Sequence, residues 1–530
     1  MHNDLQESIC YLWHMQLLVV DACFQLKSMP SSIGNLQNLN VLCISRCYKL
    51  LPESIMKLQK LDCLDLQYIN LRELPSGMSN MTNLRNLDNS SCYELTHMPK
   101  GMKNLNKLQK LPRFVVDEER GSSIAALRHL QLEGELKILS LEKLKDPSAA
   151  RAANLKEKGG LQILHLFKGS EAHFNESLDD VAVEVLEGLE PPQNISELQM
   201  FGGTKFPRWL NMGESSYPKL HHISLFNFSR CKHLPPLGQL QLLKTLEIRK
   251  MSLIEVVGRE FCGDNGDDVA FPSLDKITFE NMPIWKKWLI SEEEDGIARQ
   301  QSMAFTSLTQ LQIFDCPELT SLPSLPSLQE LTVTRSMKLL KSEGSLRGVG
   351  SLKSLKITED REEVRVMKGL QDLSSVEELE IIGFGELACV MESMQHLLST
   401  IQKLHIYFNA MTVLPEAMRG LMSLQSLEIK SCESLSSLGE GLRGLTALRE
   451  LSIFSCEELG CMPEYMGSLT SLQSLNICGC PDLSRRCERE KGENWHLISH
   501  IPNIYIPQYE EEAEEEATET TGLLSNTTGT

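Results

Sequence analysis

Residues 421–486 carry one phrase three times. It reads LMSLQSLEIKSCESLSSL at 421–438, LTALRELSIFSCEELGCMP at 445–463 and LTSLQSLNICGCPDLSRR at 469–486. The leading leucines, Leu424, Leu448 and Leu472, are 24 residues apart in both steps. Each copy has the form L-x-x-L-x-I-x-x-C-x-x-L, which aligns three further columns: Leu427, Leu451 and Leu475; Ile429, Ile453 and Ile477; and Cys432, Cys456 and Cys480. Such a constant interval indicates stacked copies of one structural unit.

The spacing within each copy predicts a strand. Its x-L-x-I-x centre alternates apolar and polar residues with period two, so one face is buried and the other is wet. A single strand of this kind cannot bury its apolar side, whereas stacked copies can, each touching only its neighbours. The pattern is that of a leucine-rich repeat. We therefore expect an α/β leucine-rich repeat solenoid, a curved horseshoe with a parallel β-sheet on its concave face.

The cysteines follow the same periodicity. The chain has 16 of them. Seven occupy one repeat position: Cys23, Cys47, Cys92, Cys316, Cys432, Cys456 and Cys480. We expect this column to turn inward and to hydrogen-bond with backbone groups where each strand ends, as asparagine does in other repeats. Structural, reduced thiols favour the cytosol over an oxidising compartment.

Composition excludes several classes of function. The hydrophobic content of 41% with only 6% aromatic residues is typical of leucine packing. The formal charge of −19 argues against nucleic-acid binding, which needs a basic patch. No window approaches ~18 uninterrupted apolar residues, so no membrane span is predicted. The N-terminal region has acidic residues, Asp4 and Glu7, where a secretion signal would be basic.

The repeats divide the chain into five predicted segments. Residues 1–111 are N-terminal leucine-rich repeats that start without a cap, and 112–160 form an irregular repeat region. There Asp146 and Pro147 open a short helix, with aspartate at the cap and proline in the first turn. Residues 161–484 are repeats with long insertions before 307, residues 485–509 form a C-terminal cap, and 510–530 form a disordered acidic tail. Because solenoids need a polar cap, the uncapped start predicts a piece of a larger protein or a shortened relative of one.

Specific phrases carry a family resemblance. They include FPRWL at 206–210, LPPLGQL at 234–240, MPIWKKW at 282–288 and KGENWHLISHIPNIYI at 491–506. Together they resemble the leucine-rich repeat region of plant coiled-coil-type nucleotide-binding disease-resistance receptors, over essentially residues 15–507. LEGELKILSLEKLKDPSAARAANLKEK at 132–158 resembles the irregular repeat region of many of them. The resemblance implies an intracellular immune receptor whose repeats sense pathogen effectors and restrain a nucleotide-driven switch.

The chain departs from that family in one motif. It contains no G-x-x-x-x-G-K-S/T phosphate loop, so neither a nucleotide cofactor nor ATP hydrolysis carries over to it. There is also no H-E-x-x-H, no G-x-S-x-G and no paired C-x-x-C set. Cys461, Cys478, Cys480 and Cys487 are close in sequence, but Cys480 belongs to the repeat column, which makes a metal cluster the weaker interpretation. We expect no enzyme activity, no metal and no cofactor.

Binding is then expected on the wet face of the strands, because solenoids bind partners on their concave surface. The framework columns are constant, while the positions between and after them change in every repeat. Aromatic and basic residues are the usual interface anchors. Among the variable positions they give these candidate protein-binding residues: Phe314, Arg335, Tyr407, Phe408, Lys430 and Phe454. The alternative is that individual members pack on neighbouring strand residues.

Function follows from the resemblance and from this face. We expect a plant disease-resistance protein, a recognition and regulatory module that lacks the nucleotide-binding domain. Its partners would be a pathogen effector or a guarded host protein, and a coiled-coil and nucleotide-binding module in cis or in trans. The cytoplasm is the expected location, with the nucleus as a second one. The alternatives are a repeat-only cytosolic signalling scaffold, an extracellular repeat receptor, which lacks its signal peptide and L-x-G-x-I-P turn here, and a receptor fragment without function.

Overall fold

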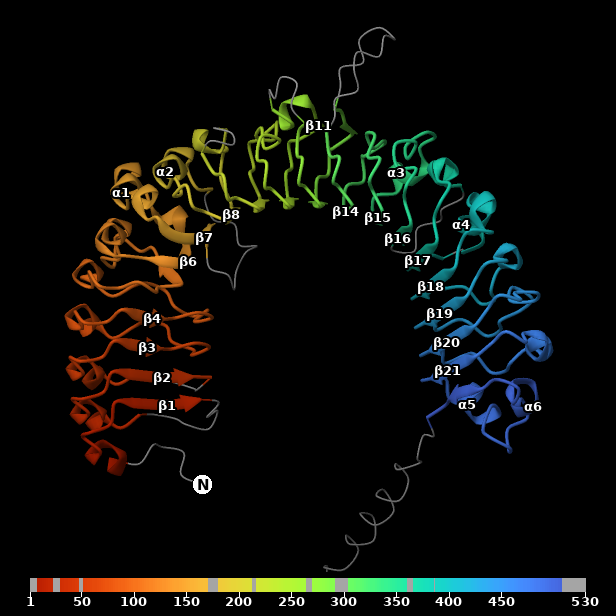
Figure 1. Cartoon of the computed structure of the whole chain (residues 1–530), viewed down its shortest axis with the longest axis horizontal. Coiled ribbons are helices and arrows are strands. Elements are labelled where there is room, and N and C mark those ends of the chain that lie inside the picture. The colour runs from red at the N-terminus through yellow and green to blue at the C-terminus, as the bar shows by residue number, and fades with distance from the viewer. Residues whose placement is uncertain are drawn as a thin grey trace, which may run out of the picture. The chain divides into compact units, whose positions relative to one another are not determined.

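The computed structural model describes residues 7–21, 29–46, 51–169, 180–211, 216–263, 269–290, 304–359, 366–385 and 387–507 (Figure 1). The chain divides into two compact units, Met1–Leu328 and Gln329–Thr530. Some predictions lie outside the described residues. They are Cys23 and Cys47 of the cysteine column, the acidic tail at 510–530, and the parts of the long insertions at 264–268 and 291–303.

Parallel strands dominate the first unit. One sheet has the order β1-β2-β3-β4, a second has the order β5-β6-β7-β8-β9-β10-β12-β14, and a small third sheet pairs β11 with β13. The strands are β1 (Leu17–Asp21), β2 (Val41–Ser45), β3 (Cys63–Asp65), β4 (Asn86–Asp88), β5 (Arg113–Val115), β6 (Glu133–Leu139), β7 (Gly160–Phe167), β8 (Glu197–Phe201), β9 (His222–Phe226), β10 (Thr245–Arg249), β11 (Val256–Val257), β12 (Lys276–Glu280), β13 (Lys287–Trp288) and β14 (Gln310–Phe314).

The second unit has one parallel sheet in sequence order, from β15 to β22. The strands are β15 (Glu330–Thr334), β16 (Ser354–Thr358), β17 (Glu378–Ile382), β18 (Lys403–Tyr407), β19 (Ser426–Lys430), β20 (Glu450–Phe454), β21 (Ser474–Cys478) and β22 (Asn503–Tyr505). In each unit the strands lie on the inner, concave side, and the helices and turns lie on the outer side (Figure 1). The predicted leucine-rich repeat solenoid is confirmed.

Short helices connect the strands. The α-helices are α1 (Pro147–Ala152), α2 (Val183–Gly188), α3 (Met337–Lys341), α4 (Leu387–Ser393), α5 (Pro481–Arg486) and α6 (Trp495–Ile498). Elsewhere 3-10 turns follow the Leu-Pro and Met-Pro dipeptides, and Pro415 and Pro463 directly precede two of them, Glu416–Gly420 and Glu464–Ser468. Proline suits this place because its fixed φ matches the extended residue that opens a helical turn. In the described residues no helix is long and apolar enough to cross a membrane.

The repeat columns form the core, as predicted. In the three quoted copies, the residues of the second leucine column, the isoleucine column and the cysteine column are each 0% exposed, and the leading leucines are at most 2% exposed. Register pairs Leu427 with Leu451 and Leu451 with Leu475, so each column runs unbroken from repeat to repeat. Each fully buried leucine contributes roughly 1.5–3 kcal/mol relative to an exposed one. The constant spacing therefore stabilises the fold by stacking identical side chains.

The cysteine column bonds to the backbone at the strand ends. Sγ of Cys432 lies 3.6 Å from the carbonyl oxygen of Lys430, and Sγ of Cys480 lies 3.6 Å from that of Cys478. Asn409 takes the same place in the preceding repeat, where its Nδ2 donates to the carbonyls of Tyr407 (2.8 Å) and Ile381 (3.2 Å). The predicted likeness of the cysteines to asparagine is confirmed.

The irregular region contains the predicted short helix. Helix α1 has Asp146 at its N-cap, whose carboxylate accepts a hydrogen bond from the Ser148 backbone N–H (2.8 Å), and Pro147 lies in the first turn. This arrangement satisfies one of the free N–H groups at a helix start. Helix α5 (Pro481–Arg486) spans the boundary predicted between the repeats and the cap at 484/485. The segment boundaries themselves stay predictions.

Candidate protein-binding face

Strand alternation decides which side chains of the second unit face outward. On β18, Leu404 and Ile406 are 0% exposed, whereas Lys403, His405 and Tyr407 point to the other, solvent-accessible face. The same alternation holds on β19 and β20. Because parallel strands are paired in register, outward residues of successive repeats form straight rows across the sheet. We call this surface the strand face of the second unit.

Three predicted residues are adjacent in one row of the strand face. Tyr407 pairs with Lys430, and Lys430 pairs with Phe454. Tyr407 and Phe454 are half-buried, and Lys430 is exposed. The row continues through Ile382 on one side and Cys478 on the other. In the register of the sheet a lysine thus lies between two aromatic residues. Aromatic residues are enriched at protein interfaces.

Phe408 and Arg335 occupy a second position, one residue after their strands. Both have left-handed backbones, with φ of 53° and 45°. Their N–H groups donate to the carbonyls of Lys430 and Thr358 in the next repeat, each at 3.0 Å. The Phe408 side chain is 58% exposed, which is unusual for phenylalanine. The structure therefore brings Phe408 to the edge of the strand face, beside Tyr407.

Phe314 belongs to the first unit. It is the last residue of β14 and pairs with Glu280 on β12. It occupies the same repeat position as Tyr407 and Phe454, as the column pattern predicted, and it is half-buried. The structure groups Tyr407, Phe408, Lys430 and Phe454 within the second unit and places Phe314 among first-unit residues.

Charged groups surround Tyr407. His405 lies with Nε2 3.5 Å from Glu378 Oε1 and Nδ1 3.6 Å from Glu428 Oε2, and Lys356 Nζ lies 2.7 Å from Glu380 Oε1. Burial, and then the charge and hydrogen bond of Glu428, raise the pKa of Tyr407 well above its usual value. The phenol is therefore uncharged at neutral pH and serves as a hydrogen-bond donor.

Sequence reasoning missed an aromatic row on the outward face of the first unit. Phe167, Phe201 and Phe226 are register partners on β7, β8 and β9. Their ring centroids are 4.4 Å apart for the first pair, which is stacked, and 5.1 Å for the second. Lys250 Nζ lies 5.0 Å from the centroid of Phe226, within cation–π range. The sequence did contain a sign of this row, because each phenylalanine directly follows the second buried column of its repeat. Long insertions separate these repeats and make the common position hard to recognise.

Three of the four tryptophans in the first unit are buried and structural, whereas Trp13 is 59% exposed. Trp285 is 0%, Trp288 2% and Trp209 3% exposed. Trp285 and Trp288 pack on Phe279 with centroid distances of 4.6 and 5.2 Å. Trp209 Nε1 donates to the Leu186 carbonyl at 2.9 Å. In the part of the chain that the structure describes, no group of three or more His, Cys, Asp or Glu side chains is arranged to hold a metal ion.

Comparison with known proteins finds similarity to plant disease-resistance proteins. Residues 124–251 match the family described as R13L1/DRL21 LRRs. The chain is 35% identical to the putative disease resistance protein At3g14460 of Arabidopsis thaliana, covering 58% of this chain and 24% of that protein. It is 34% identical to the putative disease resistance RPP13-like protein 1 of Arabidopsis thaliana, covering 42% of this chain and 22% of that protein. It is 33% identical to the disease resistance protein RGA2 of Solanum bulbocastanum, covering 43% and 23%.

These relatives are much longer than the region they share with this chain. The chain spans about a quarter of the length of each of the three. The shared region has the repeat fold described above, and the resemblance predicted from the sequence is confirmed. The chain thus has a leucine-rich repeat fold, and its repeats are similar to the repeat region of plant coiled-coil-type nucleotide-binding disease-resistance proteins.

Proposed function

We propose that this chain is the recognition and regulatory module of a plant disease-resistance protein. It is a non-catalytic repeat module that binds other proteins through the strand face of its second unit. The similarity to disease-resistance proteins supports the biological context. The repeat fold supports the mode of action, because a solenoid offers a long surface whose framework is independent of the residues displayed on it.

One observation supports the strand face of the second unit as the binding surface. Tyr407, Lys430 and Phe454 are direct register neighbours, and Phe408 is 58% exposed beside them. Nothing in the core columns requires aromatic residues there, since the equivalent positions in other repeats are Thr358 and Ile382. A cluster of aromatic side chains around one cation has the composition of a binding hot spot.

The charges of the strand face indicate what kind of partner surface would fit it. Around the aromatic cluster the strand face carries Glu378, Glu380, Glu428 and Glu450 against Lys356, Lys403 and Lys430. A partner surface with basic residues and an apolar centre would match it. We propose a pathogen effector or a guarded host protein as the external partner, and a coiled-coil and nucleotide-binding module as the regulatory one, in cis or in trans. The proposed location is the cytoplasm, with the nucleus as a second one.

Co-precipitation from plant cells tests the proposal. The full chain is expressed with a separate coiled-coil and nucleotide-binding module from a disease-resistance relative. The test variant is Tyr407→Ala/Phe408→Ala/Phe454→Ala. The matched control is Met422→Ala/Val413→Ala, which removes large exposed side chains from the same unit outside the cluster; they are 54% and 45% exposed. Circular dichroism of each purified chain verifies folding.

The expected result is association of the native chain and of the control, and loss of association in the triple variant. If a folded triple variant still associates with the module, the contact lies outside the strand face. No association of the folded native chain with any such module would remove the regulatory part of the proposal and favour an independent scaffold.

A further inference from the structure

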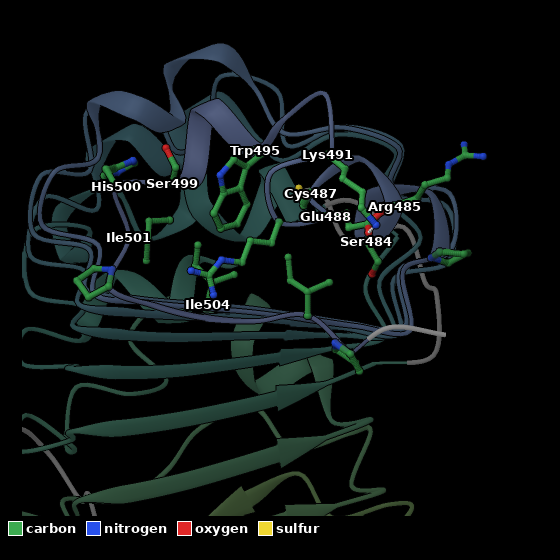
Figure 2. Close-up of a pocket in the computed structure, with 15 residues that line it drawn as sticks. Ser484, Arg485, Cys487, Glu488, Lys491, Trp495, Ser499, His500, Ile501 and Ile504 are labelled. Carbon is green, nitrogen blue, oxygen red and sulfur yellow. Dashed lines mark hydrogen bonds and ion pairs between the residues drawn. The ribbon is translucent and has the colours of Figure 1, made fainter. Parts of the chain in front are cut away.

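A groove lies at the C-terminal end of the second unit. It has a volume of about 1040 Å³ and is formed by α5, α6, the loop between them and the chain through β22 to Pro507. Figure 2 shows Ile501 and Trp495 towards one end of the groove, and Lys491, Glu488 and Ser484 towards the other. In the described residues β22 pairs with β21 alone, so the groove adjoins the last strand of the sheet. None of these residues belongs to the strand-face cluster.

Basic side chains outnumber carboxylates among the residues that line the groove, where Arg485, Arg489 and Lys491 accompany Glu488. Each cation already has an acidic neighbour. Lys491 Nζ lies 2.8 Å from Glu488 Oε1, Arg485 Nη2 lies 2.8 Å from Asp482 Oδ1, and Arg489 Nε lies 3.9 Å from Glu490 Oε1. These ion pairs are solvent-exposed and therefore weak, so their cations remain available to a second anion. Trp495 and Ile504 add apolar surface to the groove, and both side chains are half-buried.

Ser484 adds an independent indication of a ligand. Its side chain lines the groove and the residue is 8% exposed. Among the described residues its Oγ has no hydrogen-bond partner. Leaving a buried hydroxyl without a hydrogen-bond partner is destabilising, so such groups are nearly always satisfied. A carboxylate entering the groove would accept a hydrogen bond from it.

We propose that the acidic segment 510–516 of this chain docks in the groove. The segment reads EEEAEEE and carries six carboxylates. Its position supports this assignment, because Pro507 itself lines the groove and Glu510 follows three residues later. With Cα atoms 3.8 Å apart, Glu510 lies within about 11 Å of Pro507 along the chain. The short tether gives an effective concentration on the order of millimolar, so weak contacts suffice.

In the docked state glutamates pair with Arg489 and Lys491, and one carboxylate accepts a hydrogen bond from the Ser484 hydroxyl. The segment covers the apolar surface of Trp495 and Ile504. The contact is electrostatic at an exposed site, so it weakens as ionic strength rises.

The test uses the full chain in two forms, native and with Glu510, Glu511, Glu512, Glu514, Glu515 and Glu516 all changed to Gln. The probe is a fluorescein-labelled peptide of residues 508–518, followed by fluorescence anisotropy at about 0.05 M salt. We expect the peptide to bind the glutamine variant at least about tenfold more tightly than the native chain, whose own segment competes. Amide hydrogen exchange in 484–506 is expected to be faster in the glutamine variant.

Three further variants are built on the glutamine chain. Arg489→Glu/Lys491→Glu is expected to weaken peptide binding about tenfold or more, and Ser484→Ala several-fold. The control Lys60→Glu/Lys107→Glu carries the same change in net charge on the first unit and is expected to bind as the glutamine chain does. Equal binding by the native and glutamine chains would overturn the proposal and assign the groove to an acidic peptide from another protein. Binding unaffected by Arg489→Glu/Lys491→Glu, or no binding at low salt, would also overturn it.

Discussion

The hydroxyl of Tyr407 lies 3.2 Å from Nδ1 of His405, two residues earlier on the same strand. His405 in turn lies between the carboxylates of Glu378 and Glu428 on the two flanking strands. The central residue of the proposed binding face is therefore part of a polar network across three repeats. Partner binding at Tyr407 and protonation of the groups in this network are therefore coupled. A partner that bonds to the Tyr407 hydroxyl must replace the hydrogen bond that the hydroxyl shares with His405.

Tyr407 should make stability sensitive to high pH. Burial and the neighbouring glutamates raise the pKa of its phenol, whereas an unfolded tyrosine has a pKa of about 10. The folded state thus holds the proton more tightly, and this contribution to stability is fully present below pH ~10 and is lost as the pH rises above it. Between pH 8 and 10.5 the urea midpoint of the native chain should fall more than that of Tyr407→Phe.

The control for this titration is Tyr68→Phe, which changes an exposed tyrosine of the first unit (54% exposed). It should retain the native pH dependence. If the urea midpoint fell equally for the native chain and for Tyr407→Phe, burial and the neighbouring glutamates would not raise the pKa of the Tyr407 phenol.

Asn409 should be important for folding. It is 2% exposed, and its side chain donates to two carbonyls and accepts from the Phe384 N–H at 2.9 Å. Asn409→Ala removes all three bonds and leaves the buried Phe384 N–H without this acceptor, whereas the Tyr407 carbonyl still accepts from the Gly383 N–H at 3.0 Å. The change should cost about 1–3 kcal/mol of unfolding free energy. Asn409→Cys should cost less, since cysteine fills this position in the next repeats. Urea unfolding measures both.

The matched control is Asn476→Ala, which removes an asparagine from the wet face of β21, where Nδ2 donates only to Ser452 Oγ (3.0 Å). Its cost should be below about 1 kcal/mol. If Asn409→Ala and Asn476→Ala prove equally mild, the ladder position does not stabilise the strand ends.

Two of the buried cysteines, Cys456 and Cys316, should resist alkylation in the folded chain. Cys456 is 0% exposed, and a hydrogen bond with Cys432 together with burial raises its pKa to about 11. Burial raises the pKa of Cys316 to about 12. Thiolate is the reactive form, so at pH 8 only about one Cys456 side chain in a thousand is reactive even before burial is considered. Cys461 is exposed.

Iodoacetamide at pH 8, followed by peptide mass spectrometry, should therefore label Cys461 at least about 100-fold faster than Cys456 or Cys316. In 6 M guanidinium the three rates should become similar, because unfolding removes both burial and the thiol–thiol contact. Comparable rates in the folded chain would mean that the cysteine column opens readily and is not a rigid part of the core.

The core of this protein is predictable from sequence because its residues repeat. Leu427, Ile429 and Cys432 recur at a fixed interval, and stacking requires the same residue type in each coil. The regular interval also located Tyr407, Lys430 and Phe454 in one row. It was not enough to find neighbours within one row where insertions make the repeat spacing irregular. The Phe167–Phe201 stack is an example, since 34 residues separate its members and the register exists only after folding.

The repeat pattern could not predict the groove at the C-terminal end, for another reason. Ser484, Lys491 and Ile504 belong to different elements without a common period, and only the fold brings them around one cavity. The division at Leu328 is also not marked by any change in the strand pattern. Sequence thus predicts what repeats, and misses what depends on a single, non-periodic packing arrangement.

Phe408 offers the clearest separation of folding from binding. Its φ of 53° costs about 1 kcal/mol or more for a residue with a side chain, and 58% of it is exposed, so little burial offsets this strain. Gly383 and Gly479 occupy the equivalent position in other repeats, with φ of 81° and 72°. Phe408→Gly should therefore leave the urea midpoint unchanged or raise it slightly, while weakening partner association as Phe408→Ala does. A glycine variant that loses more than about 1 kcal/mol of stability would show that the ring is needed for packing, and the case for Phe408 as a binding residue would fall with it.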